Sequence, residues 1–320
     1  MFPARPGDLL PKKPPAFTSL ESSSVASCPL CGGDPGLFQP FASHAVGALV
    51  IRYMLCGRCS LVFQSPRLTQ PALDRHYQDE YRKRSHSQER DPRKDRWVQE
   101  RRAGHLAAVV RRYQLQFRRH LDVGSSLGIL LQAFSREFGS EGYGVEPGVS
   151  DRAEATAAGQ RVVASMELLP RQAAGTFDLV TLSHVLEHLP DPVGTLRLVR
   201  QEWLAAQGLV LIETPDLYSH PSFELGHLVS FSEQTLRGAL SAAGFEIVEL
   251  QRHGRPYSRL LPLFLLAVAR AAPTAAGASF RRPRPGWIRF RRWLGLTRLR
   301  CARLAARRLL GRRQLQPWSD

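Results

Sequence analysis

Four cysteines in two pairs have a spacing that points to metal chemistry. The pairs are Cys28-Pro-Leu-Cys31 and Cys56-Gly-Arg-Cys59, with 24 residues between them. Two residues between thiolates let both sulfurs reach one ion, and two such pairs complete a tetrahedral zinc site. We expect a structural zinc held by Cys28, Cys31, Cys56 and Cys59, because four thiolates leave no open position. The alternative is four unrelated buried or redox-active thiols.

A second group of chemistry-bearing residues is His184-Val-Leu-Glu187-His188, which directly follows an apolar run that predicts a strand. Three interpretations stay open. Glu187 and His188 could hold a loop without a chemical role, His184 could be a general base, or His184, Glu187 and His188 could bind a divalent metal. Histidine titrates near neutral pH, so it can accept a proton from a hydroxyl or from an acidified carbon.

A glycine-containing loop is the third group. Leu121-Asp-Val-Gly124-Ser-Ser-Leu-Gly128 predicts a strand, a tight turn and then a helix that begins with Ile129. The glycines allow a ligand to approach the backbone closely, and the helix N-terminus offers free N–H groups. Glu146 ends the next expected strand, where an acid can accept hydrogen bonds from both hydroxyls of a ribose.

These motifs resemble those of the class I S-adenosylmethionine-dependent methyltransferases. The matching segments keep the order and spacing of that family over roughly residues 100–250. They are Asp122-x-Gly124-x-x-x-Gly128, Gly144-Val-Glu146, Phe177-Asp178-Leu-Val-x-x-x-His184-Val-Leu-Glu-His188-Leu-x-Asp191-Pro192 and Ala243-Gly244-Phe245. Ser126 stands where a middle glycine is usual.

The resemblance implies S-adenosylmethionine as cofactor. The residues expected to bind it are Asp122, Gly124, Ser126, Gly128, Glu146, Ser165, Met166 and Ser183. Ser165 stands where the family often has an acid that contacts adenine, so the adenine amino group would rely on the backbone and on Met166. The family also places a substrate-facing histidine before an apolar-aromatic segment with serine, which His227-Leu-Val-Ser-Phe-Ser matches. His227 is therefore the first candidate for the catalytic base and His184 the second. The alternative for His227 is a histidine on a surface loop.

Strand and helix patterns alternate along this part of the chain, which favours a parallel, doubly wound sheet. The expected strands lie at 121–123, 142–146, 161–164, 176–182, 209–214 and 245–250, and the expected helices at 106–113, 129–134, 152–158, 193–206 and 236–243. The predicted fold is an α/β, Rossmann-like methyltransferase with a small N-terminal zinc module and a basic C-terminal tail. Ligands of such sheets bind at the carboxyl ends of the strands.

The expected domain organisation has five parts. They are a disordered leader (1–27), the zinc module with a cover helix (28–82), a charged linker or helix (83–104), the methyltransferase domain (105–254) and a basic amphipathic tail (255–320). Tyr77 and Tyr81 lie one turn apart on the cover helix. The cysteine pairs followed by this tyrosine segment resemble the N-terminal module of a methyltransferase branch that includes sugar C-methyltransferases. In that branch, this module helps to cover the active site. Packing of both tyrosines on a helix face is the equal alternative.

The net charge of +16 lies in the tail, because residues 251–320 contain 17 arginines, no lysine and one acid. No apolar run is long enough to span a bilayer and the N-terminus lacks the apolar core of a signal peptide, so the cytoplasm is the expected compartment. Trp287, Phe290 and Trp293 among the arginines suit an anionic membrane surface, which would attach the protein peripherally to the inner face. A solvated basic tail is the alternative, and nucleic acid is the less favoured partner.

The function expected from these observations is methyl transfer from S-adenosylmethionine to oxygen or carbon of a small molecule, with a sugar or a glycan or lipid-linked precursor first. The alternatives are an RNA methyltransferase and a non-catalytic binding protein with a degenerate fold, for which Ser126 and Ser165 would mark the decay. Against RNA, residues 1–250 carry no net charge and contain no Asn-Pro-Pro-Tyr-type motif.

Overall fold

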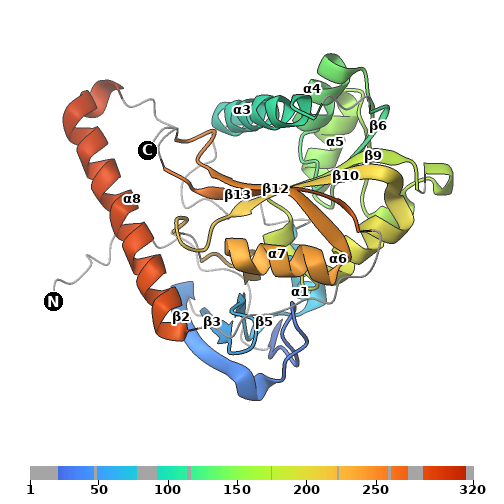
Figure 1. The fold of residues 1–320 in the computed structure, drawn as a ribbon. Helices are drawn as coiled ribbons and strands as arrows, with labels where there is room; N and C mark the ends of the chain where they lie inside the picture. Colours follow the sequence, from blue (N-terminus) through green and yellow to red (C-terminus); the bar gives the residue numbers. More distant parts are fainter. Residues whose placement is uncertain are drawn as a thin grey trace.

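The structure is a computed structural model, and it describes residues 21–46, 49–77, 92–113, 117–173, 175–221, 223–258, 261–272 and 284–314. Most of the expected leader, Tyr81 and residues 83–91 of the expected linker lie outside these ranges. The described residues form a large sheet between helices, a small sheet on one side and a long C-terminal helix along the edge (Figure 1).

The large sheet has seven strands in the order β12-β13-β10-β9-β6-β7-β8. These strands are β6 (Arg119–Val123), β7 (Glu141–Val145), β8 (Arg161–Val163), β9 (Phe177–Ser183), β10 (Leu204–Pro215), β12 (Phe245–His253) and β13 (Phe264–Ala271). Neighbours from β10 to β8 are parallel, whereas β13 pairs antiparallel with both β10 and β12. The prediction of a doubly wound, mostly parallel α/β sheet is confirmed.

Helices cover both faces of this sheet (Figure 1). On one face lie α3 (Pro92–Arg111) and α4 (Ile129–Phe138), whose apolar residues share a cluster with Leu179 and Leu211 of the sheet. On the other face lie α6 (Pro192–Leu198) and α7 (Glu233–Ala242), which belong to the main core. The helix α5 (Val149–Ala157) follows β7.

Local sequence signals explain where these helices begin and end. In α4, Ile129, Leu130, Leu131 and Phe134 recur at helical spacing and are buried. The chain leaves α4 at Gly139 with a φ of 68°, the left-handed conformation in which glycine commonly ends helices. In α7, the side chain of Ser232 accepts from the N–H of Thr235, and the threonine hydroxyl accepts from the N–H of Ser232. This capping box fixes the start of α7.

Two elements differ from the expected boundaries. The helix expected at 193–206 ends earlier, because α6 passes into a π-helical turn, Val199–Trp203, and the strand β10 begins at Leu204. The helix before β6 is longer than expected, since α3 starts at Pro92 within the segment 83–104. Val98 and Ala103 of α3 are buried, so this charged segment also carries a narrow apolar face.

The tail expected at 255–320 contains a strand of the main sheet. The strand β13 inserts between β10 and β12, and six of its eight residues are buried. The sheet therefore extends past the boundary expected at residue 254. The apolar run near Leu265 is buried inside the sheet, which explains its composition. A run too short to span a membrane fits such a buried strand.

The N-terminal module is a second sheet with the strand order β11-β4-β3-β2. Its strands are β2 (Phe38–Val46), β3 (Leu49–Cys56), β4 (Val62–Gln64) and β11 (Val229–Ser230). The strand β11 lies between β10 and β12 in the sequence, so a segment that connects two strands of the large sheet completes this small sheet. Two short strands, β1 (Ser22–Ser23) and β5 (Arg67–Leu68), pair beside it, and α1 (Gln70–Arg75) follows. Short 3-10 turns cover Pro35–Leu37, Met166–Leu168, Arg171–Ala173 and Leu186–His188.

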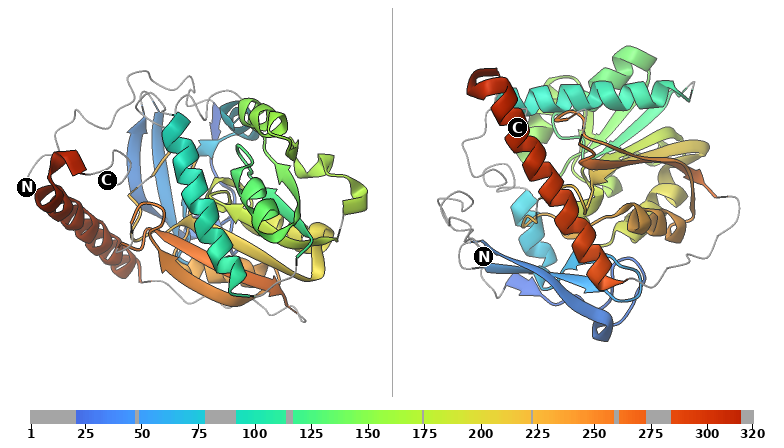
Figure 2. Two further views of the ribbon diagram at one scale, coloured as in Figure 1. Left: turned by 90° about the horizontal axis from the view of Figure 1, so that it is seen from above. Right: turned by 60° about the vertical axis from the view of Figure 1, so that its left-hand side comes forward.

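The arginine-rich C-terminal segment forms one long helix, α8 (Pro285–Gln314), which runs from the N-terminal module along the side of the molecule (Figure 2). Arg289 donates to the carbonyl oxygens of Pro40 and Phe41 in β2, so the start of α8 contacts the N-terminal module. Within the described ranges, no helix combines the length and the apolar character that a membrane crossing requires.

Candidate functional site

The glycine loop after β6 adopts the tight conformation that its sequence suggests. Gly124, Ser126 and Gly128 have φ angles of 74°, 48° and 70°, all in the left-handed region. A Cβ atom at Gly124 would lie 2.3 Å from Cγ2 of Val185, so only glycine fits there. Ser126 is held in this uncommon conformation by hydrogen bonds, since its hydroxyl donates to Asp151 at 3.0 Å and accepts from Gln99 at 3.2 Å.

Glu146 lies at the end of β7 and faces the glycine loop. Its two carboxylate oxygens accept the N–H groups of Ser126 at 2.9 Å and Gly148 at 2.7 Å. The acid thus ties the loop to the next strand. Each carboxylate oxygen can accept more than one hydrogen bond, so these contacts leave acceptor capacity for the hydroxyls of a ribose.

The other residues expected at the cofactor lie at the same edge or just below it. Asp122 is buried in β6, accepts from the Thr181 hydroxyl at 2.6 Å, and burial raises its pKa to about 7. Ser165 and Met166 follow β8, and Ser183 ends β9, where its hydroxyl donates to Glu213 at 2.6 Å. Since β6 to β9 are parallel neighbours, their carboxyl ends bring all of these residues to one edge.

His184 sits between two buried carboxylates. Its Nδ1 lies 3.3 Å from Glu187 Oε1 and its Nε2 lies 3.5 Å from Glu213 Oε2. Its φ of 56° is uncommon for a residue with a side chain, and such strain often occurs at functional sites. Burial, with the charge of Arg102, holds the pKa of His184 well below its usual range, although Glu213 opposes this.

Glu213 is a site residue that sequence reasoning missed. It is fully buried near the end of β10, with Arg102 Nε at 3.0 Å and His253 Nε2 at 3.3 Å. The signal for Glu213 was a single acid inside an otherwise apolar strand. A buried strand tolerates a charged side chain only when that charge is paired. Arg102 belongs to the charged segment expected to be a linker or a helix, and its partner lies far away in the sequence.

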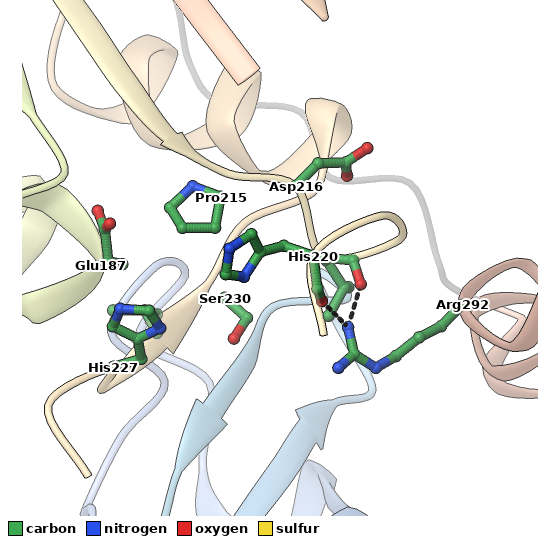
Figure 3. Close-up of a pocket in the computed structure, with 9 residues that line it drawn as sticks. Glu187, Pro215, Asp216, His220, His227, Ser230 and Arg292 are labelled. Atoms are coloured by element: carbon green, nitrogen blue, oxygen red, sulfur yellow. Dashed lines mark hydrogen bonds between the residues drawn. The ribbon is translucent and has the colours of Figure 1, made fainter. Parts of the chain in front are cut away.

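His227 lies in a pocket beyond the end of β10 (Figure 3). The pocket is lined by Glu187, Pro215, Asp216, Leu217, His220, His227, Val229, Ser230 and Arg292. Only 11% of the His227 side chain is exposed, so it is not a histidine on a surface loop. Asp216 and Arg292 are further site residues that the sequence did not single out.

Glu187, His188 and His227 form a group in which one potential ligand atom from each residue lies within 4.8 Å of the others. The divalent-metal interpretation, one of the three left open by the sequence, contained His184 in place of His227. His188 is held by its Nδ1, which lies 2.8 Å from the Gly226 carbonyl and 3.1 Å from the Tyr77 hydroxyl. Burial lowers the pKa of His188 to about 4, so this imidazole is neutral at physiological pH. Tyr77 therefore reaches the site from the cover segment.

The four cysteines of the N-terminal module converge. Sγ atoms lie 3.5 Å apart for Cys28 and Cys59 and 3.6 Å apart for Cys31 and Cys56, and all four lie within 4.8 Å of one another. Zinc–sulfur bonds of about 2.3 Å in a tetrahedron place the sulfurs about 3.8 Å apart. The arrangement is therefore compatible with one zinc ion.

Part of the chain matches a known protein family. Residues 95–250 match a family model described as a methyltransferase domain. No curated protein matches the chain. Similar solved structures include S-adenosylmethionine-dependent methyltransferases from Clostridium acetobutylicum, Mesorhizobium loti and Archaeoglobus fulgidus.

These three structures share 12%, 21% and 21% identity with the chain and have TM-scores of 0.43, 0.41 and 0.42. They cover 55%, 52% and 54% of this chain and 92%, 97% and 97% of their own. Residues 95–250 are therefore a methyltransferase domain.

Proposed function

We propose that this S-adenosylmethionine-dependent methyltransferase methylates an oxygen or a carbon of a small-molecule acceptor, with a sugar or a glycan or lipid-linked precursor as the first candidate. The observation that carries the proposal is the pocket beyond β10, where Glu187, His220, His227 and Ser230 lie together. Hydrogen-bonding groups of this kind suit a hydroxyl-rich acceptor. Because the pocket lies among the N-terminal module, the 216–231 loop and α8, it favours a small acceptor over a macromolecule.

In this proposal the cofactor lies over the carboxyl ends of β6 to β9. Gly124, Ser126 and Gly128 shape the loop, and Glu146 accepts from the ribose hydroxyls in addition to its two backbone donors. Ser165 and Met166 lie toward adenine, while Asp122 and Ser183 support the edge from below. When bound, the cofactor supplies a methyl group that its sulfonium has already activated.

His227 is the proposed base. It accepts the proton of the acceptor hydroxyl, or of an acidified carbon, as the new bond to methyl forms, and the sulfur keeps the electron pair of the broken bond. His184 remains the second candidate. Both of its ring nitrogens face carboxylates, which suits a positioning role better than proton transfer.

The four cysteines hold a structural zinc in this proposal, with Cys28, Cys31, Cys56 and Cys59 as ligands. Three of the cysteines are buried and the fourth is half-buried. A closed thiolate shell has no open position, so the metal would stabilise the small N-terminal sheet and take no part in the reaction.

A cytoplasmic protein attached to an anionic membrane surface is the proposed setting. On α8, Trp287, Phe290 and Trp293 are 55%, 47% and 61% exposed, and neighbouring ring centroids lie 5.6 Å and 5.9 Å apart. Ile288, Arg292 and Leu299 are buried against the molecule on the other side of the helix. At 3.6 residues per turn, these two groups lie on opposite faces, so the aromatic face is turned outward among arginines.

The test of the proposed function is transfer of a labelled methyl group. Full-length protein is incubated with S-adenosylmethionine carrying a 13C methyl group and, in separate reactions, with a small-molecule extract or with total RNA. We expect labelled products in the small-molecule fraction, each heavier by one CH2 plus the isotope. Label found only in RNA would support the runner-up function, and label in neither fraction would support the non-catalytic alternative.

A further inference from the structure

We propose that Gln64 and Arg292 are positioning residues that fix the loop from Asp216 to Phe231, here called the acceptor loop. Neither residue belongs to the matched segment 95–250. The acceptor loop supplies His220, His227 and Ser230 to the pocket. The inference rests on the proposed function, in which this loop forms the acceptor side of the active site.

Gln64 holds the second half of the acceptor loop. It is 1% exposed, and its side-chain amide donates to the carbonyl oxygens of Glu224 at 2.7 Å and His227 at 2.8 Å. The Leu225 carbonyl lies 3.2 Å away, and the backbone N–H of Gln64 donates to Leu228 at 2.8 Å. One side chain thus binds the backbone on both sides of the turn that carries His227.

The strand β3 also anchors the acceptor loop. The Tyr53 hydroxyl, 3.0 Å from the Gln64 amide nitrogen, donates to the Glu224 carbonyl oxygen at 2.9 Å. The Tyr53 ring stacks on Phe223 with 4.0 Å between centroids. Directly after the turn, Val229 pairs with Phe63 in the module's sheet. The loop is therefore anchored to the same small sheet that the cysteines close.

Arg292 holds the first half of the acceptor loop from α8. It is 8% exposed and donates to the carbonyl oxygens of Leu217 and, at 3.2 Å, His220. Its guanidinium lies 4.1 Å from the centre of the Phe223 ring. Burial lowers its pKa to about 10, so it stays charged at neutral pH. A Cβ atom at Gly295, one turn later, would lie 2.0 Å from the Tyr218 carbonyl, so α8 docks closely here.

The contacts of Gln64 and Arg292 both lie on the acceptor side. The described contacts of Gln64 and Arg292 go to residues 53 and 217–228, whereas the cofactor edge is built from Gly124 to Ser183. A buried carbonyl group that loses its hydrogen-bond donor must be hydrated instead. We therefore expect the acceptor loop to open when either Gln64 or Arg292 is replaced. Cofactor binding should then remain.

The experiment uses the full-length protein and two variants, Gln64→Glu and Arg292→Met. Gln64→Glu keeps the size of the side chain and replaces its donors by oxygens that face carbonyls. Gln70→Glu and Arg298→Met are the controls, because the described hydrogen bond of the Gln70 side chain goes to nearby Asp74 and Arg298 is exposed on α8. Tyr53→Phe, which removes only one hydroxyl, replaces the first variant if that one fails to fold.

Three readouts are compared. We expect amide hydrogens of residues 217–231 to exchange roughly tenfold faster in both variants, with exchange at 119–146 unchanged. The NMR signal of the His227 imidazole should shift, whereas the signal of the core residue His120 should not. A general loss of stability would not produce this difference between the two histidines. Affinity for S-adenosylmethionine, measured by calorimetry, should stay within about twofold of the wild-type value.

The proposal is overturned if loop exchange and the His227 signal stay as in the wild type, or if exchange rises equally at 119–146. None of these readouts needs the acceptor. A failed methyl-transfer assay with a positive result here would therefore refute the proposed function and leave the positioning role intact.

Discussion

His227 is the residue on which the proposed chemistry depends most. If it accepts the proton, His227→Ala should lower turnover by roughly 10²–10⁴-fold, because that is the usual contribution of a general base. Affinity for S-adenosylmethionine should hardly change, since the imidazole lines the pocket beyond β10 and not the glycine loop. The measurement is the rate of labelled methyl transfer to the identified acceptor, combined with calorimetry.

His184→Ala is the matched variant for this test. Both histidines belong to the same edge, but His184 is held between Glu187 and Glu213. Full activity of His227→Ala together with a large loss in His184→Ala would assign the base to His184. A loss in both variants with weakened cofactor binding would indicate damage to the whole edge.

Sequence spacing could predict which residues reach the carboxyl edge of the sheet but not how they are held there. The pattern around Gly124, Gly128 and Glu146 is local, and a strand followed by a turn and a helix fixes its geometry. The support of Ser126 by Asp151 and Gln99 comes from two other helices, which no local pattern reveals. The pairing of Glu213 with Arg102 is equally distant in sequence.

At the scale of elements, hydrophobic periodicity predicted the parallel strands well because each is an apolar run between turns. Predictions failed where tertiary contacts override the local pattern. The helix that begins at Pro192 changes into a π-helical turn at Val199. The strand β13 was not predicted, because an apolar run of this length also fits an amphipathic tail. The strand β11 has two residues, too few for any periodic signal.

The N-terminal module gives the prediction that belongs to this scale. Elemental analysis should find about one zinc per chain, the stoichiometry of a four-thiolate site. Cys56→Ser should lose the metal and lower the melting temperature, because the small sheet has little core of its own. Cys301→Ser is the control, since Cys301 is exposed on α8 and far from the other cysteines in sequence. Metal-free protein with wild-type melting behaviour would refute the assignment.

At the scale of the whole molecule, the N-terminal module and the C-terminal helix α8 meet around the acceptor side. The module reaches it through Gln64 and the C-terminal helix reaches it through Arg292, while Arg289 joins the helix to β2. Composition predicted that residues 255–320 are basic. It could not predict that Arg292 is buried, because that depends on carbonyl groups more than seventy residues away.

The exposed aromatic face of α8 leads to a prediction about membranes. Full-length protein should bind anionic vesicles and lose binding as salt rises, because each arginine near the surface adds about 1 kcal/mol that ions screen. Replacing Trp287, Phe290 and Trp293 by serine should abolish flotation with the vesicles. The control replaces Val149, Leu168 and Val248, which are exposed apolar residues of the main domain.

The outcomes of that flotation assay separate the possible partners of α8. Equal flotation of the aromatic variant and the control would rule out insertion of the aromatic face. Preference of the full-length protein for RNA over vesicles would show that the arginines serve nucleic acid instead.

Binding of S-adenosylmethionine, measured by calorimetry, tests the central claim most directly. We expect the wild-type protein to bind and Glu146→Ala to bind roughly 10–150-fold more weakly, which corresponds to about 1.5–3 kcal/mol for hydrogen bonds to a charged group. Glu141→Ala is the control, because Glu141 lies at the other end of β7 and pairs with Arg119 and Arg161. No binding by the wild-type protein, or equal affinity in Glu146→Ala, would contradict the account of this site.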